Sequence, residues 1–80
     1  PPVIDPFMRY TPTKQLYIKK NLFNMAKTNV INKYKAENDT NNITPEIEKT
    51  LQDQIIVEME RVVEVWKKSE KDGHPLLKLN

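Results

Sequence analysis

The stretch that decides the fold runs from Ile43 to Gly73 and reads ITPEIEKTLQDQIIVEMERVVEVWKKSEKDG. Thr44 is a good N-cap, and Pro45 suits the first helical position because a helix leaves the N–H there unbonded. Gly73 is the only glycine in the chain and stands where a left-handed residue ends a helix. These start and stop signals predict one long helix over residues 45–72, about 42 Å in length.

The apolar face of this predicted helix is wide. At about 100° per residue, most of its apolar side chains fall within an arc of about 120°, and two more widen the arc to about 180°. A surface helix needs an apolar stripe of only about 100°. The helix therefore packs either on two neighbours inside a small bundle, or on its own chain on one side and a partner on the other. The arc contains Ile47, Leu51, Ile55, Met59, Val62, Val65 and Trp66, and the widening residues are Ile56 and Val63.

A second helix is predicted over residues 12–36, because Thr11-Pro12 repeats the same start signal. One apolar stripe on it is formed by Leu16, Phe23, Ala26, Val30, Ile31 and Tyr34, and a second by Ile18, Leu22 and Met25. The segment 37–44 is rich in Asn and Asp, which favours a polar loop. Since such a loop lets two helices fold back on each other, we expect an all-α chain with two long amphipathic helices in an antiparallel hairpin.

Both ends of the chain are predicted to be extended tails. Residues 1–11 combine prolines, which disfavour a regular helix, with the large apolar residues Val3, Ile4, Phe7, Met8 and Tyr10. We therefore expect this segment to dock along another surface, the alternative being a disordered terminus. Residues 73–80 form a short C-terminal tail whose leucines dock or fray.

The size of the chain indicates that it depends on a partner. Eighty residues form at most one domain, and without cysteine neither a disulfide nor a thiolate metal site can support so small a core. We expect the partners to be other protein subunits of a large complex, not a second copy of the chain. The residues expected to bind them are Phe7, Tyr10, Ile55, Met59, Val62 and Trp66.

Charge is distributed unevenly along the chain. Residues 1–37 carry seven basic and two acidic groups, whereas residues 38–80 carry six basic and nine acidic ones. Three interpretations are open: the two helices pair with each other, the lysines contact rRNA phosphates, or the acid-free basic segment is a retained mitochondrial import signal. The candidates for RNA contact are Lys14, Lys19, Lys20, Lys27, Lys33 and Lys35.

Residues suited to catalysis are scarce. His74 and Ser69 are the only histidine and serine, and neither has an obvious catalytic partner. Glu58 falls inside the apolar arc, where a carboxylate is costly unless it is paired. Arg61 can reach it from three residues on, the alternatives being an arginine of a partner or a catalytic acid. We therefore predict no enzymatic activity, no cofactor and no metal site. We also predict no membrane span, because no apolar run is long enough to cross a bilayer.

The segment Leu16-Tyr17-Ile18, followed by Leu22-Phe23, resembles the opening of the LYR-motif mitochondrial accessory proteins. Those proteins are small basic helical bundles that serve respiratory complexes, iron–sulfur delivery and ribosome assembly. The third motif position here is Ile18 instead of Arg, and a third helix is missing from the pattern. The resemblance therefore assigns no functional residue to this chain.

Together these features predict a non-enzymatic accessory subunit of a large assembly. The first hypothesis is a small structural protein of the mitochondrial ribosome, located in the mitochondrial matrix and in contact with proteins and rRNA. The alternative is a soluble helical-hairpin subunit or assembly factor of a protein-only complex, respiratory or nuclear. The nucleus and the cytoplasm are the alternative locations.

Overall fold

The structure, a computed structural model, describes residues 5–78 of the chain. Within this range it contains helices and no strand: the 3₁₀ helix η1 (Pro6–Arg9) is followed by α1 (Pro12–Glu37), α2 (Pro45–Thr50) and α3 (Gln52–Lys71). The predicted all-α class is confirmed. Val3 and Ile4 of the predicted docking tail, and residues 79–80 of the C-terminal tail, lie outside the described residues.

Both predicted helix starts are confirmed. The hydroxyl of Thr11 accepts a hydrogen bond from the backbone N–H of Lys14 at 3.3 Å, and the hydroxyl of Thr44 accepts one from Ile47, also at 3.3 Å. A proline follows each cap and loses no helical hydrogen bond at that position. At the other end, α3 gives way to Gly73, whose φ of 75° lies in the left-handed region that the sequence indicated.

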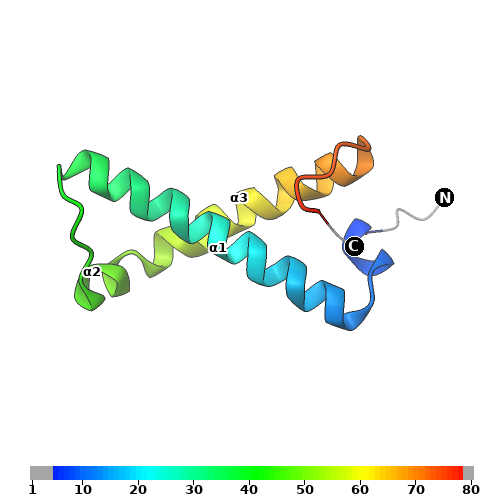
Figure 1. Cartoon of the computed structure of the whole chain (residues 1–80), viewed down its shortest axis with the longest axis horizontal. Coiled ribbons are helices and arrows are strands. Elements are labelled where there is room, and N and C mark those ends of the chain that lie inside the picture. Colours follow the sequence, from blue (N-terminus) through cyan, green and yellow to red (C-terminus); the bar gives the residue numbers. More distant parts are fainter. Residues whose placement is uncertain (1–4, 79–80) are drawn as a thin grey trace.

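The prediction of one uninterrupted helix over residues 45–72 is wrong at Leu51, which separates α2 from α3. The N–H of Leu51 is shared between the carbonyls of Ile47 and Glu48, at 3.1 Å each. The Thr50 hydroxyl also donates to the Ile47 carbonyl, at 2.7 Å, and thereby competes with the regular helical bond. Figure 1 shows that the chain changes direction here, between α2 and α3.

The prediction of an extended path over residues 1–11 is also wrong for part of that segment. A carboxylate oxygen of Asp5 accepts the N–H of Phe7 at 2.9 Å, and Pro6 occupies the first position of η1. Asp5-Pro6 therefore starts a helical turn in the same way as the two Thr-Pro pairs, because proline disfavours the interior of a helix and suits its first position.

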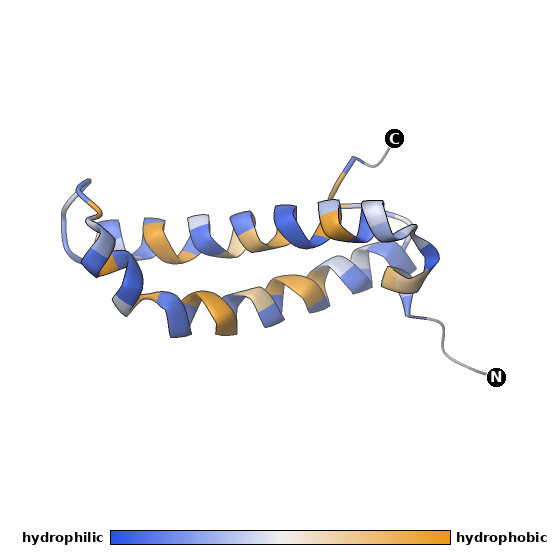
Figure 2. Cartoon of the chain, turned by 90° about the horizontal axis from the view of Figure 1, so that it is seen from below, coloured by the Kyte–Doolittle hydropathy of each residue, from blue (hydrophilic) through white to orange (hydrophobic). Residues whose placement is uncertain are grey.

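The two long helices form two layers that cross. They run in opposite directions, their axes cross in Figure 1, and one lies above the other in Figure 2. The buried residues of α1 are spaced four apart: Ile18, Leu22, Ala26 and Val30. Ridges with this spacing pack in the commonest class of helix pairs, in which the axes cross at about 50°. The spacing of the buried residues thus accounts for the crossing.

The core consists of two clusters along these helices. Ile18, Leu22, Ala26, Val62 and Trp66 form the first, which lies toward η1, and Val30, Leu51 and Ile55 form the second, which lies toward α2. Crossing helices diverge beyond the crossing point, so a straight continuation of α3 would leave α1. The bend at Leu51 avoids this, because it brings Ile47 onto the second cluster. At the opposite end, Leu77 of the C-terminal segment packs on the first cluster.

Candidate protein-binding groove

An apolar groove lies between α1 and α3. Its floor consists of Phe23 from α1 and of Ile56, Met59 and Val63 from α3, and Glu60 and Glu64 complete its lining. The groove has a volume of about 560 Å³. Phe23 and Ile56 are exposed, whereas Met59 and Val63 are half-buried. We call these six residues the apolar groove.

The apolar groove continues along the molecule in both directions. Toward α2 it joins a hollow of about 380 Å³ that shares Phe23 and Ile56 with it. Toward η1 it joins a hollow of about 200 Å³ that shares Met59 and Val63 with it. A site for a compact ligand normally has several polar groups that converge on one point. A continuous trough with an apolar floor fits an elongated occupant better.

The lysines beside this trough already have partners within the chain. Lys27 pairs with Glu48 at 2.5 Å, Lys67 pairs with Asp5 at 3.5 Å, and the Lys19 Nζ lies over the Phe7 ring, 5.1 Å from its centroid. Each of these three lysines lines one of the two adjoining hollows. Carboxylates thus balance the charges of Lys27 and Lys67, whereas the Lys19 cation rests against an aromatic ring.

The two glutamates of the groove differ from these lysines. Glu60 and Glu64 take part in none of the ion pairs found among residues 5–78. They stand four residues apart on α3, so their carboxylates repel each other across one turn of the helix. The charge that lacks a partner at the apolar groove is therefore negative.

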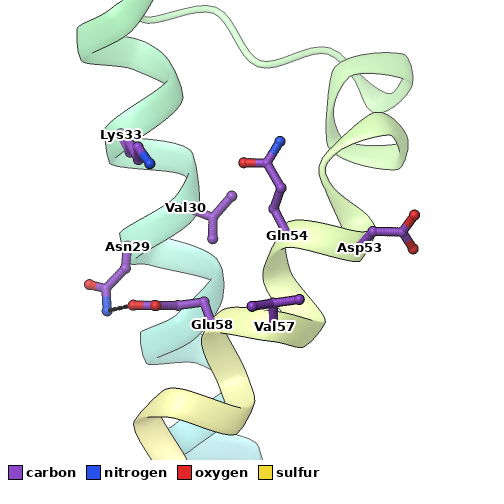
Figure 3. A pocket seen from close by; sticks show the side chains of 7 residues that line it. All are labelled: Asn29, Val30, Lys33, Asp53, Gln54, Val57 and Glu58. Atoms are coloured by element: carbon purple, nitrogen blue, oxygen red, sulfur yellow. Dashed lines mark hydrogen bonds between the residues drawn. The ribbon is translucent and has the colours of Figure 1, made fainter.

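A separate hollow, of about 420 Å³, shares no residue with the apolar groove and is more polar (Figure 3). We call it the second hollow. It is lined by Asn29, Val30, Lys33, Asp53, Gln54, Val57 and Glu58. Glu58 accepts two hydrogen bonds from Arg61, at 2.8 and 2.7 Å, and one from the Asn29 amide, at 2.9 Å. The predicted pairing of Glu58 with Arg61 is confirmed. These contacts, Arg61 first, lower the pKa of Glu58 to about 2 and connect α3 to α1.

The structure gathers the six residues predicted to bind a partner around the chain's own core. Ile55, Val62 and Trp66 are buried there. Phe7 and Tyr10 are half-buried, and each ring centroid lies 6.2 Å from that of Trp66. Met59 alone among the six lines the apolar groove itself. The centre of the wide apolar arc thus faces α1, and a partner surface has to be sought at its edges.

Tyr10 and Asp5 attach the segment around η1 to α3. The Tyr10 hydroxyl donates a hydrogen bond to a carboxylate oxygen of Glu70, which raises the pKa of Tyr10. The N–H of Phe7, followed by the charge of Lys67, lowers the pKa of Asp5. Together with the aromatic contacts on Trp66, these bonds close one end of the core.

The six lysines predicted to contact RNA do not share one face. At about 100° per residue they are distributed around the whole circumference of α1. Three of them have contacts within the chain: Lys19 with Phe7, Lys27 with Glu48, and Lys33 with Glu37 at 3.8 Å. Lys14, Lys20 and Lys35 form none of the ion pairs found among the described residues.

Residues 5–78 contain no group of three or more His, Cys, Asp and Glu side chains that could hold a metal ion. None of the helices formed by these residues has both the length and the apolar character that crossing a membrane requires. Comparisons with models of protein families, with curated proteins and with solved structures find no match to the chain. Fold and site together define a small all-helical protein with an apolar groove that the described residues leave open.

Three residues of the groove floor were not predicted to bind a partner. They are Phe23, Ile56 and Val63. Ile56 and Val63 are the two residues that widen the apolar arc of the long helix. Because the first helix covers the centre of the arc, residues at its edges stay accessible, Ile56 more than Val63. That signal was present in the sequence.

Proposed function

We propose that this chain is a non-enzymatic helical-hairpin subunit of a larger assembly and that it binds another protein through the apolar groove. The observation that carries this proposal is the contiguous surface formed by Phe23, Ile56, Met59 and Val63. Isolated apolar residues on a protein surface are ordinary, whereas a contiguous group rimmed by charge is typical of a binding site.

The balance between buried and exposed apolar residues supports the proposal. Among residues 5–78, eight apolar side chains besides Pro6 are buried and eight large ones are exposed. Among residues 5–78, the two long helices form two layers, and no third long helix covers the side of the crossing at which the groove opens. A partner that fills the groove would add the missing layer.

The distribution of lysines favours the protein-only alternative over contact with rRNA. Phosphate contacts along an RNA backbone need several cations on one surface. The lysines of α1 are spread around the helix, and Lys19, Lys27 and Lys33 have contacts inside the chain. A setting in the mitochondrial matrix remains a prediction from the basic, acid-free composition of residues 9–36.

The proposal is tested by native size fractionation of the tagged full chain from its source cells. We expect the chain to migrate with an assembly much larger than its own 9.4 kDa. Ile56→Lys should release it, because the substitution places a charge on the apolar floor. Val57→Lys is the matched control, since Val57 is 65% exposed, Ile56 is 57% exposed, and Val57 lines the second hollow instead of the groove.

Two further measurements complete this test. Circular dichroism of both variants should match the spectrum of the wild type, which excludes loss of fold as the cause. Ribonuclease treatment should leave the co-migration intact, and loss of co-migration after this treatment would favour the mitochondrial-ribosome hypothesis over the protein-only complex. Migration of the wild-type chain on its own, or an Ile56→Lys variant that stays in the assembly, would contradict the proposed function.

A further inference from the structure

We infer that the occupant of the apolar groove is an amphipathic α-helix of another protein whose apolar stripe is flanked by lysine or arginine. This inference rests on the proposed function and specifies the class of partner. It is carried by the shape of the trough, by the spacing of its floor residues and by the charge that lacks a partner beside it.

The floor consists of a row of apolar side chains against which a helix can pack. Ile56, Met59 and Val63 repeat at intervals of three and four residues, which is one row of side chains along α3. Phe23 faces this row from α1, so both helices contribute side chains to the surface that a third element would contact. An apolar helix face with anchors at positions i, i+3, i+4 and i+7 is the usual occupant of such a surface.

The charge at the groove indicates which charge the partner carries. Glu60 and Glu64 line the groove and have no cation among the ion pairs of residues 5–78. Two like charges one helical turn apart destabilise a helix slightly, and a cation between them reverses that effect. Lysines or arginines along the edge of an incoming helix would supply this cation.

A second copy of the chain is a poorer fit for the same reason. Its most basic element is α1, where Lys27 already pairs with Glu48 and Lys19 lies over Phe7. On the strip of α1 that also carries Leu16 and Phe23, Lys20 is the one cation outside the ion pairs found among residues 5–78. A second copy would therefore bring one lysine to two carboxylates. A separate helix with its own free lysines matches the groove better.

The test uses the purified full chain and two synthetic 18-residue helical peptides. Both peptides carry leucines at the i, i+3, i+4 and i+7 positions, and lysines flank the stripe in one and glutamates in the other. Fluorescence anisotropy of the labelled peptides is expected to show binding of the lysine peptide and much weaker binding of the glutamate peptide. Ile56→Lys should abolish binding, and Val57→Lys should leave it unchanged.

The role of charge is tested by the double substitution Glu60→Gln and Glu64→Gln. Exposed ion pairs contribute modestly, so the affinity of the lysine peptide should fall by about fivefold, and added salt should weaken its binding to the wild type more than to the variant. Equal binding of both peptides, or an affinity that the double variant does not change, would overturn the inference. A dimer of the chain that Ile56→Lys disrupts would also overturn it, because a second copy would then occupy the groove.

These outcomes separate the inference from the proposed function. If the chain loses its cellular assembly through Ile56→Lys but shows no preference for the lysine peptide, the partner class is wrong and the groove still binds a protein. If the assembly is indifferent to Ile56→Lys, the proposed function fails independently of any peptide.

Discussion

The substitutions Val62→Ala and Val65→Ala test the orientation of α3, on which every other statement about the groove depends. They make the same chemical change at two positions one turn apart on the same helix. Val62 is 3% exposed in the first core cluster, whereas Val65 is 43% exposed. Any difference between their effects therefore reports burial.

The expected magnitudes follow from that difference. Removal of two buried methylene equivalents at Val62 costs about 1.6 kcal/mol, and the remaining cavity adds about 0.5 kcal/mol. Alanine is the better helix former by about 0.5 kcal/mol, so the net loss is about 1.5 kcal/mol. At Val65 roughly half of the transfer term is absent and no cavity forms, so the net loss is below about 0.5 kcal/mol.

The assay is urea unfolding of the purified chain, followed by far-UV circular dichroism and by the fluorescence of Trp66, which is 1% exposed. With a slope of about 1 kcal/mol per molar urea for so small a protein, Val62→Ala should lower the midpoint by about 1.5 M. Val65→Ala should lower it by less than about 0.5 M. Equal shifts, or a larger shift for Val65→Ala, would show that α3 does not present this face to α1.

Three further substitutions test individual contacts. Glu58→Gln removes the charge that Arg61 and Asn29 stabilise, and we expect it to cost about 1–2 kcal/mol at neutral pH. Because the pKa of Glu58 is lowered to about 2, the contribution of this carboxylate to stability is complete above about pH 4.5 and is lost as the pH falls toward 2. Acid unfolding of wild type and variant will measure this loss. Tyr10→Phe removes the hydrogen bond to Glu70 and should cost about 1 kcal/mol of stability below pH 10. Since the pKa of Tyr10 is raised, this difference in stability should vanish at alkaline pH, as thermal unfolding at a series of pH values will show. Thr44→Ala removes the N-cap of α2 and should cost about 1 kcal/mol, measured by thermal unfolding.

Each of these results has a clear opposite. An acid-unfolding curve that is unchanged by Glu58→Gln would mean that the carboxylate does not connect α3 to α1. A stability difference between Tyr10→Phe and the wild type that persists above the pKa of Tyr10 would assign the effect to packing on Trp66 instead of the hydrogen bond. Thr44→Ser is the control for the cap, because serine keeps the hydroxyl, and it should lose much less stability than Thr44→Ala.

The local signals of the sequence predicted the helix boundaries well. Each of the two Thr-Pro pairs starts a helix, and Gly73 follows the last one, because capping and proline geometry act within a few residues. The same physical reason applies to Asp5-Pro6, where the turn of η1 was not predicted. Proline disfavours the interior of a helix, but at the first position, as in Pro6, it favours a helical turn.

The break at Leu51 was less accessible from the sequence. Leucine is a strong helix former, and neither glycine nor proline stands near it. The chain bends there because crossing helices diverge and Ile47 has to return to the second cluster. That is a tertiary effect, and Thr50, whose hydroxyl bonds to the Ile47 carbonyl, was its only local indication.

The candidate site shows the same division between local and tertiary information. The width of the apolar arc correctly indicated more apolar surface than one neighbour covers. It did not indicate which part of the arc faces α1, since that depends on the packing of Ile18 and Leu22 against Trp66. Ile55, Val62 and Trp66, which were expected to bind a partner, lie at the buried centre of the arc, whereas Ile56 and Val63 at its edge line the apolar groove.

The most direct test of the central claim is site-specific photo-crosslinking in the source cells. A benzophenone side chain is introduced into the full chain at position 56 in one variant and at position 57 in another. We predict that position 56 forms a crosslink to one other protein and that position 57, in the second hollow, forms none to it. No crosslink from position 56, or the same crosslink from both positions, would contradict the claim that the apolar groove is the binding site.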